Sequence, residues 1–155
     1  MNPNVLSILD RLLTTLWVGG LWAIGYLAVP ILFSQLDNRM LAGALAGHMF
    51  TALSYVGLVA GLGLLPIIAL HREGRWRRAR LVLVVLMMVL VAFGEFAIQP
   101  VIADLKLQGL VPGSAQAASF AVWHGIASIL YLINSLLGLV VAALGCNAGV
   151  NRAAA

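Results

Sequence analysis

Charge is the scarcest property of this chain. Only 9% of its 155 residues are Asp, Glu, Lys or Arg, whereas 63% are hydrophobic. Soluble domains contain about one quarter charged residues and about one half apolar residues. The composition therefore excludes an ordinary water-soluble domain, and we expect an integral membrane protein whose first partner is the lipid bilayer.

Cysteine and catalytic motifs are also nearly missing. The single cysteine, Cys146, cannot form a disulfide within the chain. The sequence holds no nucleophilic triad, phosphate-binding glycine loop or zinc motif, so it gives no basis for assigning an enzymatic reaction. The net charge of +4 comes nearly all from one short segment, which makes nucleic acid a poor candidate partner.

Four apolar stretches are long enough to cross a bilayer. Residues 12–36 hold no Asp, Glu, Lys, Arg or His, and residues 40–70, 81–103 and 107–151 hold one of these each. About 20 residues span the hydrocarbon core, and lipid tolerates only helices or closed barrels. We therefore predict an all-α, up-down bundle of four transmembrane helices, over residues 8–34, 43–70, 80–103 and 117–145. The bundle forms a single domain over residues 1–155, and no internal repeat is evident.

The segment between the second and third predicted helices is strongly basic. Its sequence is HREGRWRRAR (residues 71–80), and its arginines are Arg72, Arg75, Arg77, Arg78 and Arg80. The other two loops hold one cation each, so the positive-inside rule predicts that this loop and both termini face the cytoplasm of a bacterial inner membrane. The arginines either anchor the chain at the interface or bind an anionic lipid head group.

Glycines and prolines indicate close helix packing. Gly43 and Gly47 are four residues apart, as are Gly57 and Gly61, and this spacing lets transmembrane helices approach closely. Three prolines near predicted helix ends can kink the helices. They are Pro30, Pro66 and Pro100.

Three ionisable residues fall inside the predicted spans at a similar depth. With a rise of about 1.5 Å per residue, His48 lies roughly 7 Å, Glu95 about 6 Å and His124 about 5 Å outward of the bilayer midplane. A lone charge that faces lipid costs several kcal/mol. We therefore expect all three side chains to face the interior of the bundle.

Other polar residues continue from these three on the same helix faces. On the fourth helix, a stripe at helical spacing holds His124, Ser128, Tyr131 and Ser135. The matching pairs on the second and third helices are His48 with Tyr55 and Glu95 with Gln99. These stripes define a candidate intramembrane site.

One interpretation of this site is a cofactor centre. The second and fourth helices of an up-down bundle lie diagonally, so His48 and His124 can point at each other across the core. Two such histidines can ligate a haem b or a copper-type metal ion, with Glu95 as a further ligand, a partner for a histidine N–H or a proton acceptor. The residues expected to line the cofactor are Tyr55, Gln99, Ser128 and Tyr131.

Three other interpretations use the same residues. The histidines can hydrogen-bond to neighbouring helices and serve packing alone. The chain can be a non-catalytic small subunit or assembly factor of a membrane complex, or a homo-oligomer, that docks through its glycine-rich first or second helix. It can also be a small proton or solute transporter in which Glu95 titrates.

Three segments resemble a known family. They are WVGGLWAIGYLAVPILF (residues 17–33), AGALAGHMFTALSYVGLV (residues 42–59) and FAVWHGIASILYLINSLLG (residues 120–138). They are similar to the transmembrane protein 205-like family, whose bacterial members form a domain of unknown function. The resemblance implies a four-helix membrane fold, distantly like copper resistance protein D and the haem-using membrane protoporphyrinogen oxidase. By that analogy it implies haem or copper at His124.

Overall fold

The computed structural model describes residues 3–70 and 76–153, with side chains described for residues 4–70 and 76–145. The helices are α1 (Pro3–Ala23), α2 (Val29–Gln35), α3 (Arg39–Leu70), α4 (Arg77–Phe93), α5 (Gln99–Leu107) and α6 (Ala115–Ala153). Two π-helical segments, η1 (Ile24–Ala28) and η2 (Gly94–Ile98), join α1 to α2 and α4 to α5. No strand occurs in these described ranges.

Four helices are long and apolar enough to cross a membrane. They are Asn4–Gln35, Arg39–Leu70, Arg77–Leu107 and Ala115–Gly145. Each helix predicted from the sequence lies within one of these four spans, which extend past it by a few residues at one end or both. The predicted all-α fold with four membrane-spanning helices is therefore confirmed.

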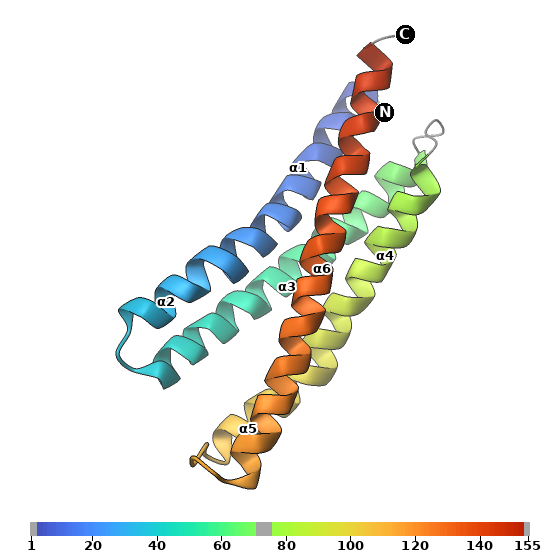
Figure 1. Ribbon diagram of the computed structural model, residues 1–155. Coiled ribbons are helices and arrows are strands. Elements are labelled where there is room, and N and C mark those ends of the chain that lie inside the picture. The colour runs from blue at the N-terminus through green and yellow to red at the C-terminus, as the bar shows by residue number, and fades with distance from the viewer. Residues whose placement is uncertain (1–2, 71–75, 154–155) are drawn as a thin grey trace.

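The helices form two hairpins (Figure 1). The first hairpin runs from α1 through η1 and α2 to α3, and the second runs from α4 through η2 and α5 to α6. Helix α1 contacts α3 and α6, and α4 also contacts α3 and α6, so α3 and α6 lie diagonally. Both termini and the start of α4 lie at one end, which we call the terminal end. At the opposite, distal end, the tips of the hairpins diverge.

A π-helical turn precedes a proline in both hairpins. The Val29 N–H donates to the Ile24 carbonyl just before Pro30, and the Gln99 N–H donates to the Gly94 carbonyl just before Pro100. Proline lacks an N–H, and its ring crowds the carbonyl four residues earlier. A wider turn accommodates this crowding without ending the helix. The same π-helical turn before a proline therefore occurs in both hairpins, although no repeat was evident in the sequence.

The core is formed by residues of α1, α3, α4 and α6. Trp17 of α1 is 1% exposed and packs against the backbone of α3. A β-carbon at Gly57 would lie 2.9 Å from Trp17 Cε2, and one at Gly61 would lie 2.6 Å from the Met88 side chain. The close packing predicted for this glycine pair is thus observed. The other pair differs, because nothing lies within 4 Å of the same position at Gly47.

We expect Gly57→Ala to destabilise the fold by about 1–3 kcal/mol, because the rigid Trp17 ring has no room for a methyl group. Gly47→Ala is the matched control on the same helix. Its site is open, so we expect unchanged stability or a gain of up to about 1 kcal/mol from better helix propensity. Reversible unfolding in detergent micelles measures both effects. Equal stability of the two variants would contradict this packing.

Candidate functional site

The polar stripe predicted on α6 divides into a buried part and an exposed part. Ser135 is fully buried and Tyr131 is half-buried, whereas Ser128 and His124 are exposed. All four residues share one side of α6 because they follow helical spacing. The difference arises from position along the helix, since His124 and Ser128 lie toward the distal end, where the hairpins diverge (Figure 1).

The buried part of the stripe joins α6 to α1. The Tyr131 hydroxyl donates to the Leu21 carbonyl at 2.6 Å, and the Trp22 indole N–H donates to the Ser135 carbonyl at 3.4 Å. Within α6, the Ser135 hydroxyl donates to the Tyr131 carbonyl at 2.8 Å. The Tyr131 ring also packs edge-on against Phe50 of α3, with 5.0 Å between ring centroids. These groups satisfy one another and hold helices together.

The exposed part of the stripe presents an imidazole to the membrane. The His124 ring stacks on Phe120 with centroids 5.5 Å apart, and the Ser128 hydroxyl donates to the His124 carbonyl at 2.8 Å. No hydrogen bond to the His124 ring nitrogens is found within the described residues. Next to it, nothing lies within 4 Å of a β-carbon built at Gly125. We call the exposed residues Ala121, His124, Gly125 and Ser128 the His124 face.

The prediction that His48 and Tyr55 face the interior is wrong. Both side chains are exposed, and Tyr55 is 52% accessible. The interior side of α3 is instead occupied by small and aliphatic residues, among them Ala46, Leu53 and Gly57. His48 lies about half a turn away from Ala46, so its ring points outward rather than across the core toward His124.

Glu95 and Gln99 occupy intermediate positions. Both are half-buried, and Glu95 lies inside the π-helical segment η2. Among the described residues, no three His, Cys, Asp or Glu side chains form a group that could hold a metal ion. The geometry therefore does not gather His48, Glu95 and His124 into the predicted metal centre.

A largely buried ion pair between α1 and α4 was not predicted from the sequence. Arg80 Nη1 and Nη2 donate to the two carboxylate oxygens of Asp10 at 3.0 and 2.9 Å. The Arg80 side chain is 8% exposed and that of Asp10 17%. Gly145 of α6 makes room for it, because a β-carbon there would lie 3.0 Å from Arg80 Nη2. The sequence feature that could have indicated this pair is an acidic residue and an arginine near the starts of two parallel spans.

The ion pair changes the interpretation of the basic segment. Arg80 is buried, so it cannot bind a lipid head group as predicted. Arg77 donates to the Ala69 carbonyl at 2.9 Å, near the end of α3. Arg78 is exposed. Arg72 and Arg75 lie outside the described residues. Arg78 is therefore the described arginine of the segment that best fits the head-group prediction.

Four buried polar atoms have no hydrogen-bond partner within the described part of the chain. They are Thr14 Oγ1, Trp17 Nε1, Arg80 Nε and Asn134 Oδ1. An unsatisfied buried polar group costs about 1–3 kcal/mol. Thr14 follows Asp10 by one helical turn, so its unsatisfied hydroxyl lies on the same side of α1 as the ion pair.

We expect Arg80→Met to destabilise the protein by about 3–5 kcal/mol, because it leaves the Asp10 carboxylate buried without its partner. Asp10→Leu combined with Arg80→Met removes both charges and should restore most of that loss. Thr14→Val is the control, since it removes a buried hydroxyl that lacks a partner and should not destabilise the fold. Thermal unfolding followed by tryptophan fluorescence reports all three. A double variant no more stable than Arg80→Met would refute the ion pair.

Comparison with known proteins gives a family without an assigned activity. Residues 12–110 match the model of a domain of unknown function (DUF4149), which covers more than half of the chain. The search found no match among curated proteins and none among solved structures. The expectation of an uncharacterised family is confirmed, whereas the resemblance to transmembrane protein 205, copper resistance protein D and the oxidase stays a prediction. This integral membrane chain belongs to the DUF4149 family.

Proposed function

We propose that this protein is a non-catalytic subunit or assembly factor of a larger membrane complex, and that the His124 face binds a transmembrane helix of its partner. The observation that carries the proposal is an exposed imidazole at bilayer depth. His124 lies nine residues after Ala115, the first residue of its span. At about 1.5 Å per residue this places it about 14 Å into the span.

Exposure of a histidine at this depth requires an explanation. Ionisable side chains within transmembrane segments almost always face a protein interior or a water-filled cavity, because lipid offers them no hydrogen bonds. The described residues do not enclose the His124 ring, and they give its nitrogens no hydrogen bond. A polar side chain on a neighbouring protein would supply the missing hydrogen bond.

The residues around His124 suit contact with a helix. Ala121 and Gly125 are four residues apart, and both are small and exposed. Small residues at this spacing let two helix backbones approach closely, and polar side chains then hydrogen-bond across the interface. Ser128 extends the same face by one turn. Small and polar groups thus occur together where a partner helix would bind.

His48 supports the same proposal from α3. It lies nine residues after Arg39, the first residue of its span, and it is also exposed. Two intramembrane histidines on diagonal helices are therefore accessible at a similar depth. This arrangement fits a chain that lies among other membrane proteins better than one surrounded only by lipid.

The cofactor and transport interpretations have less support. Haem b or copper binding stays a prediction, because His48 points outward and the described residues form no three-ligand group. Transport through Glu95 is favoured by one observation. Its π-helical turn is a feature that is frequent at functional sites.

We expect His124→Leu to abolish co-purification of a stoichiometric partner from native membranes in mild detergent. The substitution should leave the chain folded, because the imidazole makes no hydrogen bond to the described residues. Leu139→Ala is the control, an exposed apolar position on α6 nearer the terminal end. Retention of the partner by the His124→Leu variant at the level of the unchanged protein would refute docking at this face.

A visible absorption spectrum with metal analysis separates the docking and cofactor proposals. If the protein is a non-catalytic subunit, the purified chain should show no haem absorption band and no stoichiometric copper, even from cells supplied with both. A haem band or bound copper that disappears in His124→Ala would favour the cofactor proposal instead. Comparison with His48→Ala would show whether the second histidine is also a ligand.

A further inference from the structure

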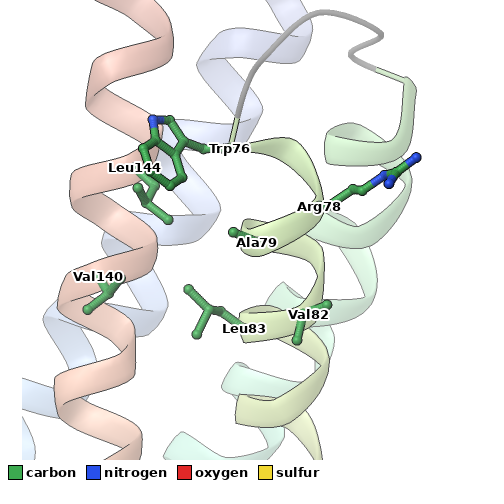
Figure 2. Close-up of a pocket in the computed structure, with 7 residues that line it drawn as sticks. All are labelled: Trp76, Arg78, Ala79, Val82, Leu83, Val140 and Leu144. Atoms are coloured by element: carbon green, nitrogen blue, oxygen red, sulfur yellow. The ribbon is translucent and has the colours of Figure 1, made fainter.

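An open groove lies between α4 and α6 at the terminal end (Figure 2). Its volume is about 500 Å³, and its lining residues are Trp76, Arg78, Ala79, Val82, Leu83, Val140 and Leu144. Apart from Arg78, every lining side chain is aliphatic or aromatic. Val82 is 65% exposed and Val140 46% exposed, so the groove opens on the surface that lipid contacts.

The lining residues lie at two levels (Figure 2). Trp76 and Arg78 are at the rim, where α4 begins, and Trp76 extends across the groove toward Leu144 of α6. Val140 and Leu83 lie further along the helices. An aromatic residue and an arginine at the rim, with aliphatic residues below, match the order of head group and hydrocarbon in a bilayer.

The charge at the rim is positive. Three arginines belong to the start of α4, and no acidic residue lies in its first turn. Arg80 is held by Asp10, and Arg77 is bound to the Ala69 carbonyl. Arg78 is exposed, with its guanidinium on the side of α4 away from α6 in Figure 2. Its long, flexible side chain can reach a phosphate group at the level of Trp76.

We propose that this groove binds one acyl chain of an anionic phospholipid, whose phosphate interacts with Arg78 at the rim. A hydrocarbon chain suits the groove because its lining below the rim offers no polar group to a ligand. A net negative head group suits the rim because basic residues at the membrane surface attract anionic lipids. The site is separate from the His124 face, which lies toward the distal end.

The test is native mass spectrometry of the full chain, released from micelles with equimolar phosphatidylglycerol and phosphatidylcholine. The unchanged protein should retain phosphatidylglycerol preferentially. Arg78→Gln should lower that retention about fivefold, as expected for one basic residue near an anionic surface, with phosphatidylcholine unchanged. Val140→Phe fills the exposed side of the groove and should lower retention of both lipids.

Arg11→Gln is the matched control. Arg11 is an exposed arginine near the same end, but it lies on α1 and does not line the groove. Its substitution should leave lipid retention unchanged. An equal loss in Arg11→Gln and Arg78→Gln, equal retention of the two lipids by the unchanged protein, or full retention by Val140→Phe would each overturn the proposal. So would a lipid-independent dimer broken by Val140→Phe, because the groove would then hold a second copy.

Discussion

A bilayer offers no hydrogen bonds, so every polar group of this chain within the membrane needs a partner from protein. Two contacts between the helices of the bundle meet this constraint. Asp10 pairs with Arg80 between the two hairpins, and Tyr131 donates to the α1 backbone. The same constraint is not met at His124, whose ring is exposed near the distal end. The difference between these groups is the physical basis of the proposed docking role.

The two hairpins are built on one plan. The first helix of each contains a π-helical turn followed by a proline, and it contacts both α3 and α6. In the first hairpin, the hydroxyl of Tyr131 bonds to the Leu21 carbonyl just before this turn. In the second, the turn carries Glu95. Equivalent backbone features therefore serve packing in one hairpin and position an ionisable residue in the other.

Hydrophobicity alone predicted the fold, because long apolar runs leave a membrane chain few options. The Gly57–Gly61 contact was also predictable from spacing. The direction of His48 was not, because depth follows from counting residues whereas orientation depends on which face packs. On α3 the small residues face the interior, so His48 faces outward. The Asp10–Arg80 pair was not predicted because its members are 70 positions apart. Both also lie near span ends, where charged residues are common.

The docking role depends on whether a protein covers the His124 face in the native membrane. Photocrosslinking tests this directly, with a photoreactive amino acid at Ala121, a member of the His124 face, and at Val59 on α3 as the comparison site. Both positions are exposed. A discrete adduct with a different protein from Ala121 but not from Val59 is the expected result. Adducts only with lipid, or an adduct of twice the chain mass, would contradict a partner protein at this face.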